Sequence, residues 1–243
     1  MRSVSVNKIS KRYGKVQALR DVSFSVGKGE IFGLIGPDGA GKTTMFRILA
    51  TLLLPDAGNA TLDGFDVVSE MKDIRKRVGY MPGKFSLYQD LTVEENLHFF
   101  ATLFGTTVEE GYDSIRAIYS QIEPFRNRRA GALSGGMKQK LALSCALVHQ
   151  PSVLLLDEPT TGVDPATRRQ FWELIYDAAK RGITVFVTTH YMDEAEYCDR
   201  ISIMVDGKIK AMGSPDQLKR ELNQPDMDHV FTYLARQATR GNK

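Results

Sequence analysis

The chain has 243 residues, of which 42% are hydrophobic and 25% are charged, and its formal net charge is +3. This length suits one large α/β domain, or a core domain with an inserted lobe, and the composition is ordinary for a globular protein. The small net charge gives no argument for a nucleic-acid partner. The chain also contains no run of about 18 apolar residues, which is the length that a helix needs to cross a bilayer. Any membrane contact would therefore be made through a partner protein.

Two stretches near the N-terminus alternate apolar and polar residues, as half-buried strands do. Val4, Val6 and Ile9 alternate with polar residues, and the apolar residues between Val16 and Val26 do the same. We therefore expect an antiparallel β subdomain whose sheet is complete before the next motif begins.

Residues 36–44 form the most informative stretch of the chain. Their sequence, Gly-Pro-Asp-Gly-Ala-Gly-Lys-Thr-Thr, fits the phosphate-loop pattern G-x-x-x-x-G-K-S/T between an apolar strand and a helix. Glycines let backbone N–H groups surround a triphosphate, and the helix directs its positive end at the same anion. We expect Lys42 to reach the β and γ phosphates and the Thr43 hydroxyl to hold Mg²⁺. The predicted nucleotide-binding residues are Gly36, Pro37, Asp38, Gly39, Ala40, Gly41, Lys42, Thr43 and Thr44.

Short elements continue the α/β pattern, and a helical region then follows. We expect a strand at 60–64, a basic helix at about 70–77 and a strand at 78–81. From about residue 86 to residue 150, apolar residues recur mainly at helical spacing. This region predicts an α-helical subdomain inserted into the α/β core.

Two helix starts can be located inside the helical region. Thr92 and Glu95 form a capping box, and the helix that they open is expected to end at Gly105, with more helix at 112–122. Ser134-Gly135-Gly136 opens a later helix and offers a hydroxyl and free N–H groups to an anion. An ordinary helix cap is the alternative for these three residues.

A continuous apolar run at 152–156 predicts a buried parallel strand that ends in two carboxylates. Ligands bind at the carboxyl ends of such strands. Asp157 is predicted to hold Mg²⁺ through its water shell, and Glu158 to polarise the attacking water. The alternative is a strand that merely ends in an acidic turn.

The remaining elements return to the α/β pattern. In order, we expect a helix from Asp164-Pro165 to about residue 181, a buried strand at 184–189, a hairpin at 200–212, a capped helix from Ser214, and a short helix and tail at 226–243. Cys145 and Cys198 are expected in helical segments as reduced thiols, which is typical of a cytosolic protein.

Together, these motifs resemble those of the ATP-binding subunit of an ABC transporter over nearly the whole chain. Counterparts exist for the Walker A loop, the Walker B strand with its catalytic glutamate, the family signature, the D-loop and the switch histidine. They are, in that order, residues 36–44, 154–158, 133–137, 161–164 and His190. Met137 stands where the family more often has glutamine. Tyr13 has the position at which the family stacks an aromatic ring on adenine.

The resemblance implies an α/β fold, namely a P-loop NTPase core with a parallel central sheet and an N-terminal antiparallel β subdomain. The α-helical subdomain at 86–150 would be inserted in this ATP-binding domain, which would span residues 1–225, before a short C-terminal helix and tail at 226–243. It also implies ATP and Mg²⁺ as cofactors, ATPase activity, and a place on the cytoplasmic face of a membrane. No nucleic-acid partner is expected.

The family mechanism implies a role for the second anion-binding helix end. Two such subunits would pair head to tail, so that each ATP lies between the Walker A loop of one and Ser134, Gly135 and Gly136 of the other, with Asp164 nearby. Closure would drive an integral membrane permease, and hydrolysis would reset it. Lys42, Glu158 and His190 would form the catalytic set, in which His190 contacts the γ-phosphate and orients the water.

One position departs from the family pattern. Gly83 stands where the family normally has the Q-loop glutamine, which touches Mg²⁺ and water and signals to the membrane domain. Gln89 is six residues further on and aligns poorly with that role. Because Lys42, Asp157 and Glu158 are present, hydrolysis is expected to survive. A homodimer and a heterodimer whose second subunit carries the glutamine are both left open.

Export is favoured over import because residues 88–97 and the short C-terminal tail resemble those of drug- and lipid-export ATPases. The transported substrate cannot be read, since specificity lies in the membrane partner. One alternative is a soluble ABC-type ATPase that acts on ribosomes or DNA, although such proteins usually carry two nucleotide domains or a long coiled coil. Another is a regulatory nucleotide-binding module without turnover, which Gly83 suggests and Glu158 opposes.

Overall fold

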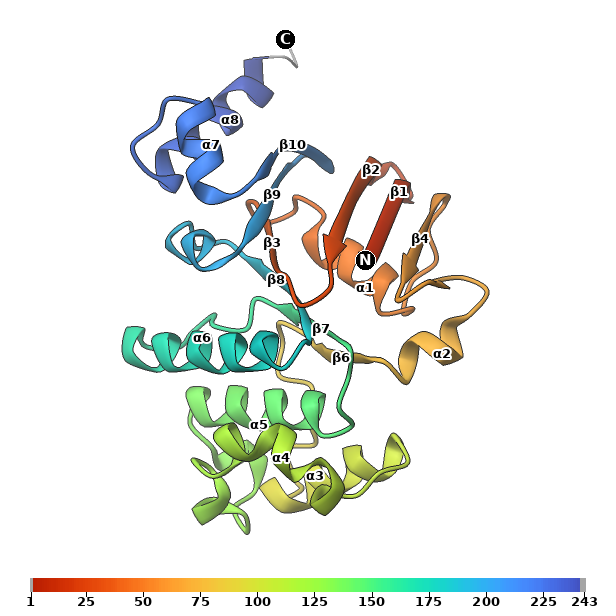
Figure 1. The fold of residues 1–243 in the computed structure, drawn as a ribbon, viewed down its shortest axis with the longest axis vertical. Helices are drawn as coiled ribbons and strands as arrows, with labels where there is room; N and C mark the ends of the chain where they lie inside the picture. Colours follow the sequence, from red (N-terminus) through yellow and green to blue (C-terminus); the bar gives the residue numbers. More distant parts are fainter. Residues whose placement is uncertain (1, 241–243) are drawn as a thin grey trace.

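The computed structural model describes the backbone of residues 2–240 and the side chains of residues 2–236 (Figure 1). Its strands form two sheets, one of four strands and one of six. Residues 241–243 of the predicted tail lie outside the described residues. No helix in the described part of the chain has the length and apolar character needed to cross a bilayer.

The four-stranded antiparallel sheet is built from strands on both sides of the phosphate loop. Its order is β2 (Val16–Gly27), β1 (Arg2–Tyr13), β4 (Ala57–Leu62) and β5 (Phe65–Asp66). The prediction that this sheet is complete before the loop is therefore wrong. Val4 on β1 lies opposite Val26 of β2 on one side and Leu62 of β4 on the other. The alternation of apolar and polar residues in β1 identifies a half-buried strand. It does not show which strands pair with its two edges, so the partner β4 was not predicted.

The six-stranded sheet forms the centre of the molecule. Its order is β10 (Lys208–Gly213), β9 (Arg200–Val205), β3 (Ile31–Ile35), β8 (Thr184–Thr189), β7 (Val153–Asp157) and β6 (Val78–Met81). All neighbouring strands are parallel except β9 and β10, which form the predicted hairpin. Asp206 and Gly207 at its turn both have positive φ, as a type I′ turn requires. Every residue of β3, β7 and β8 is buried, which accounts for their continuous apolar sequences.

The helices cover both faces of the central sheet and form a separate lobe at the bottom of Figure 1. The α-helices are α1 (Lys42–Leu49), α2 (Met71–Arg75), α3 (Val93–Leu103), α4 (Val108–Tyr119), α5 (Gly135–Leu147), α6 (Pro165–Lys180), α7 (Pro215–Glu221) and α8 (Met227–Arg240). The 3-10 helices are η1 (Glu123–Phe125), η2 (Ala130–Ala132) and η3 (Asp193–Tyr197). The lobe contains α3, α4 and α5, as the helical pattern predicts.

The second helix of the lobe begins earlier than the sequence prediction of residue 112. Thr107 and Glu110 form a capping box that starts α4 at Val108. Gly111 lies in the first turn, where glycine reads as a helix breaker. A side chain there would clash with the carbonyl oxygen of Val148, so glycine permits the close approach of α4 and α5.

Two hydrophobic clusters lie on opposite faces of the central sheet. One fills the space between the two sheets, where neighbouring ring centres lie 4.8–5.5 Å apart along the series Phe24, Phe32, Phe186 and Phe46. Phe46 belongs to α1, so the helix after the phosphate loop is anchored in this core. The other cluster joins the sheet to α6 and to the helical lobe. The loop is thus held by a rigid frame.

The two cysteines are buried and free. Cys145 lies in α5, as expected, but Cys198 follows η3 with an extended backbone, so its predicted helical setting is wrong. Burial raises the pKa of both thiols well above the ordinary value. Neither sulfur is therefore a reactive thiolate at neutral pH.

Candidate functional site

The phosphate loop connects β3 to α1, and two of its glycines are required by close backbone approaches. A Cβ at Gly36 would clash with the carbonyl oxygen of Met204. Gly41 has φ +107°, and a Cβ there would meet the carbonyl oxygen of Ala18. Because only glycine fits the space at both positions and the conformation of Gly41, the loop can expose its backbone N–H groups to an anion.

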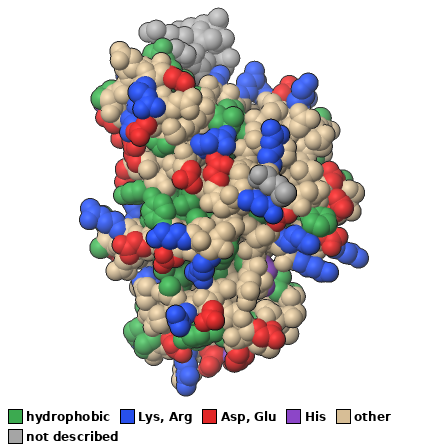
Figure 2. All heavy atoms as spheres, viewed as in Figure 1, with side chains coloured by type: hydrophobic (Ala, Val, Ile, Leu, Met, Phe, Trp, Pro, Cys, Tyr) green, Lys and Arg blue, Asp and Glu red, His purple; other side chains and the backbone are tan. Residues whose placement is uncertain are grey.

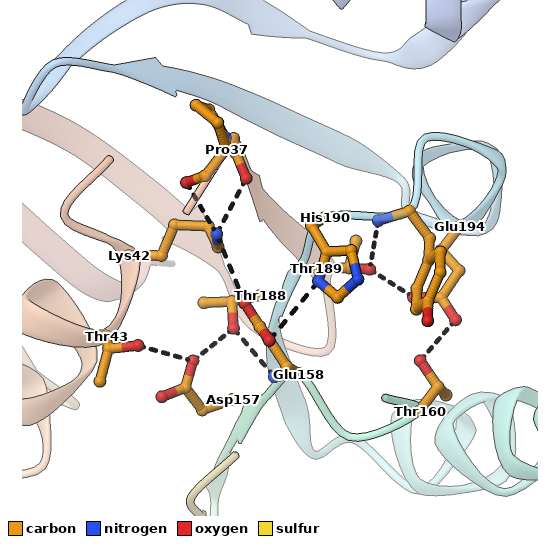
Figure 3. Close-up of polar contacts among 12 residues, drawn as sticks. Pro37, Lys42, Thr43, Asp157, Glu158, Thr160, Thr188, Thr189, His190 and Glu194 are labelled. Carbon is orange, nitrogen blue, oxygen red and sulfur yellow. Dashed lines mark hydrogen bonds and ion pairs between the residues drawn. The ribbon is translucent and has the colours of Figure 1, made fainter. Parts of the chain in front are cut away.

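Lys42 is the buried cation of the site, with a side chain that is 4% exposed. Its amine donates hydrogen bonds to the carbonyl oxygens of Gly36 and Pro37, at 2.8 and 3.1 Å. The same amine lies 3.4 Å from a carboxylate oxygen of Glu158 (Figure 3). The ammonium group is therefore fixed at the mouth of the loop by three oxygens.

The end of β7 places a carboxylate beside the first turn of α1. Asp157 accepts hydrogen bonds from the hydroxyls of Thr188, at 2.5 Å, and Thr43, at 3.4 Å. Burial raises the pKa of Asp157, and these hydrogen bonds oppose that effect. Hard oxygen ligands suit Mg²⁺, and a cation would offset the cost of the buried charge. The Thr43 and Asp157 side chains therefore fit a magnesium ion.

Glu158, which lines the phosphate cavity, lies next to His190. The Nδ1 atom of His190 lies 3.5 Å from a carboxylate oxygen of Glu158 (Figure 3). Glu158 has φ +51°, an uncommon conformation for a residue with a side chain, and its N–H donates to both oxygens of Thr188. Backbone strain of this kind is concentrated at functional sites. Ligand atoms of Asp38 also come within 4.8 Å of those of Glu158 and His190, a grouping that the sequence did not predict.

A cavity of about 660 Å³ surrounds the phosphate loop. Tyr13 lines it with a side chain that is 44% exposed, and residues 38–44 and Glu158 line it as well. The wall also includes four basic residues for which no role was predicted: Lys15, Arg20, Lys208 and Lys210. Lys208 and Lys210 lie two residues apart in one strand and therefore on the same face of it, and this spacing is the sequence signal that could have indicated a shared basic surface. Elsewhere, acidic and basic side chains are interspersed over the face viewed in Figure 2.

The predicted second anion-binding end lies on α5, away from this cavity. Ser134 caps α5 and accepts a hydrogen bond from the N–H of Met137 at 3.4 Å. A Cβ at Gly136 would lie 2.8 Å from the side chain of Thr167, close to the start of α6. Of the described residues that line the cavity around Lys42, none comes from 134–136.

Asp164 lies beside this second group. Its carboxylate accepts hydrogen bonds from the N–H groups of Ala166 and Thr167 and from the Thr167 hydroxyl. The hydroxyl hydrogen bond is the main reason why the pKa of Asp164 is lowered. The structure thus divides the predicted nucleotide-binding residues into two surfaces, one around Lys42 and one around Ser134 and Asp164.

Gly83 lies against the end of β7. A Cβ at this position would lie 3.0 Å from the carbonyl oxygen of Asp157 and 3.8 Å from the Cβ of Glu158. A glutamine side chain would therefore start beside the backbone of Asp157 and the side chain of Glu158. Gly83 leaves this space without a side chain.

Comparisons with known proteins agree with the geometry. A family model described as ABC transporter matches residues 19–161. The chain is 44% identical over 238 residues to the probable multidrug ABC transporter ATP-binding protein YbhF of Escherichia coli (strain K12). The matched region covers 95% of this chain and 41% of that protein. It is 42% identical over 222 residues to the doxorubicin resistance ATP-binding protein DrrA of Mycobacterium tuberculosis, with 89% and 67% covered. The chain therefore spans about two fifths of the YbhF relative.

Solved structures confirm the predicted fold. An ATP-binding subunit of an ABC transporter is 28% identical, with a TM-score of 0.87 over 95% of this chain and 98% of the other. A dimeric ATP-binding cassette in a post-hydrolysis state, bound to ADP and Pi, is 26% identical, with a TM-score of 0.78 over 87% and 98%. Both share the arrangement of strands and helices that positions the phosphate loop.

Proposed function

Because this chain belongs to the ABC transporter family, we propose that it is the subunit that binds and hydrolyses ATP to power a membrane permease of the export type. The observation that carries this proposal is the convergence of Lys42, Asp157 and Glu158 at one end of the central sheet. A phosphate-binding cation, a ligand for Mg²⁺ and a carboxylate base are the groups that phosphoryl transfer to water requires.

Each side chain has a role that follows from its position. Lys42 would bind the γ-phosphate through its ammonium group, and Glu158 would accept a proton from the attacking water. His190, 3.5 Å from Glu158, would orient that water. Thr43 and Asp157 would hold Mg²⁺, whose charge would neutralise the β- and γ-phosphate oxygens. Tyr13 would stack on adenine at the outer wall of the cavity.

We propose that two subunits pair head to tail around ATP. Ser134–Gly136 and Asp164 lie outside the cavity around Lys42, which supports a role in binding the phosphate of an ATP held by the other subunit. The dimeric cassette to which this chain is similar supports the arrangement. An identical chain and a different ATP-binding subunit would both complete this arrangement.

The permease would dock on an apolar groove of about 620 Å³ between the central sheet and the helical lobe, at the cytoplasmic face of the membrane. Its apolar lining includes Leu52, Pro82, Leu87, Phe100, Leu103 and Phe104. Pro82 precedes Gly83, so the groove is continuous with the loop that faces Asp157 and Glu158. The permease would therefore contact the same loop that contacts the catalytic end of β7. The names of the relatives, which include multidrug and doxorubicin resistance proteins, support export.

The first test identifies what the chain binds in its native cell. The chain is tagged, native membranes are extracted in detergent, and the co-purifying proteins are identified by mass spectrometry. A polytopic membrane protein in near-equal amount is expected. Ribosomal or chromosomal proteins, with the chain absent from membranes, would instead establish the soluble ATPase.

A matched pair of variants tests the groove. Leu103 is 63% exposed in the groove, and Val68 is 44% exposed outside it. Leu103→Glu should abolish recovery of the permease, while Val68→Glu should retain it, and both should bind ATP as the unmodified chain does. Equal recovery with both variants would show that the permease docks elsewhere.

A further inference from the structure

The geometry points to Arg168 as a positioning residue that, together with Glu194 and Tyr191, holds His190 against Glu158 and ties it to the helix that begins after Asp164. This inference rests on the proposed function, because it concerns the residue that orients water for ATP hydrolysis. Arg168 lies in α6, one turn from its start, and its N–H donates to the carbonyl oxygen of Asp164 at 2.9 Å.

Glu194 is a fully buried carboxylate that joins the ends of two neighbouring strands. It accepts hydrogen bonds from the hydroxyls of Thr160, at 2.5 Å, and Thr189, at 2.6 Å (Figure 3). Thr160 lies two residues after Glu158, and Thr189 immediately precedes His190. The segments that carry the base and the histidine are therefore held by one carboxylate.

Arg168 supplies the positive charge near this buried carboxylate. Its Nε atom lies 3.7 Å from an oxygen of Glu194, and its NH1 atom lies 3.5 Å from Asp193. A buried carboxylate that loses its cation is strongly destabilised, so the position of Glu194 depends on the guanidinium group.

The same guanidinium group also packs on an aromatic ring. Its central carbon lies 4.0 Å from the centre of the Tyr191 ring, whose centre is 4.2 Å from that of the His190 ring. The backbone N–H of Tyr191 donates to the Thr189 hydroxyl, which in turn donates to Glu194. His190 is therefore supported through its neighbouring ring and through the carboxylate, and both supports lead to Arg168.

A planar guanidinium can stack on a ring and face a carboxylate at the same time, whereas an ammonium group cannot do both. Arg168→Lys is therefore the informative variant, because it keeps the charge near Glu194 and removes the stacking surface. Tyr191→Leu removes the ring from the other side, and Tyr191→Phe keeps it. Arg169→Lys, at the adjacent position of α6, is the matched control.

Steady-state ATPase assays should separate positioning from a merely structural role. We expect Arg168→Lys to lower kcat about tenfold or more, with KM for ATP and the thermal midpoint unchanged, because small misplacements of catalytic groups cost this much. Tyr191→Leu should act similarly, and the double variant should lose little more than either single variant. Tyr191→Phe and Arg169→Lys should behave as the unmodified chain. The inference would be overturned by an unchanged kcat, by additive losses, or by a raised KM and a lowered thermal midpoint that accompany the loss of kcat.

A second measurement does not depend on turnover. The chain has four histidines, so the ring resonances of His190 can be assigned by NMR with a His190→Gln variant. Arg168→Lys should shift the His190 resonances and leave those of His98 and His229 in place. An unchanged His190 signal would overturn the inference whatever the activity. Absence of hydrolysis in the unmodified chain, with this shift present, would count against the proposed function alone.

Discussion

The side-chain amine of Lys42 lies 3.4 Å from a carboxylate oxygen of Glu158, on the shared wall of the phosphate cavity. The cation that would bind the γ-phosphate and the base that would activate water are therefore paired with each other. A γ-phosphate that binds Lys42 must compete with this carboxylate for the ammonium group. Arrival of ATP would thus free Glu158 next to the bond that is to be cleaved.

Glu158→Gln tests this relationship. The amide cannot accept the proton of the attacking water, so we expect ATP hydrolysis to fall by about 100-fold or more. ATP should still bind, since Lys42 and the loop are intact and a negative charge near the γ-phosphate is gone. Phosphate release and equilibrium ATP binding are the measurements, and Glu173→Gln, on the exposed surface of α6, is the control. Substantial turnover by Glu158→Gln would exclude Glu158 as the base.

Gly83→Gln asks whether the missing side chain limits turnover. The unmodified chain should hydrolyse ATP, and the glutamine should raise kcat because its side chain starts next to Asp157 and Glu158 and brings an amide to this end of β7. The new Cβ would lie 3.0 Å from a backbone oxygen, so Gly83→Ala is needed to measure the crowding alone. A well-folded unmodified chain without hydrolysis that Gly83→Gln does not restore would contradict this account.

Tyr13 can be tested apart from the phosphate loop. Tyr13→Ala should raise the Kd for ATP about fivefold, because aromatic stacking contributes about 1 kcal/mol. Tyr13→Phe should bind ATP as before, and inorganic triphosphate should bind all three chains equally, since it has no base. Isothermal titration calorimetry measures both ligands. An equal loss of ATP and triphosphate affinity in Tyr13→Ala would show that the ring supports the loop rather than the base.

His149 predicts a pH dependence of stability. Its Nε2 hydrogen-bonds the carbonyl oxygen of Val78 at 3.1 Å, its ring stacks on Phe104, and burial lowers its pKa to about 4. The ordinary pKa of histidine is 6.5. Between pH 6.5 and pH 4, the unfolded chain therefore binds a proton at His149 that the folded chain does not bind. The free energy of unfolding should therefore fall as pH decreases through this window, by about 2 kcal/mol from pH 7 to pH 5.

Urea unfolding at pH 7 and pH 5 measures this effect. A His149→Gln variant should lose less stability between the two pH values than the unmodified chain, by about 2 kcal/mol. If both chains lose equal stability between the two pH values, His149 is not the residue responsible.

Local signals predicted most of the fold and the segments that meet around Lys42. The loop around Lys42 needs glycines for its close backbone approaches, and the strand that ends at Asp157 is apolar because it is buried on both faces. Both sequence patterns can therefore be recognised without knowledge of the tertiary fold. Pairings between distant segments were not predictable in the same way. The helix start at Thr107 was missed because Gly111 interrupts the local pattern, although it serves the contact with α5. Arg168 was missed because only the tertiary fold brings it to Glu194.

The pairing of β1 with both β2 and β4 also determines when the four-stranded sheet can be completed during synthesis on the ribosome. Until residue 62 has emerged, one edge of β1 is unpaired. The core around Phe46 of α1 also lacks the side chains that β4 contributes to it. An N-terminal hairpin released early would carry a long unpaired strand that favours association with other chains. The strand that closes this edge is encoded only after the phosphate loop, so protection of the nascent hairpin and the embedding of α1 arise in the same step.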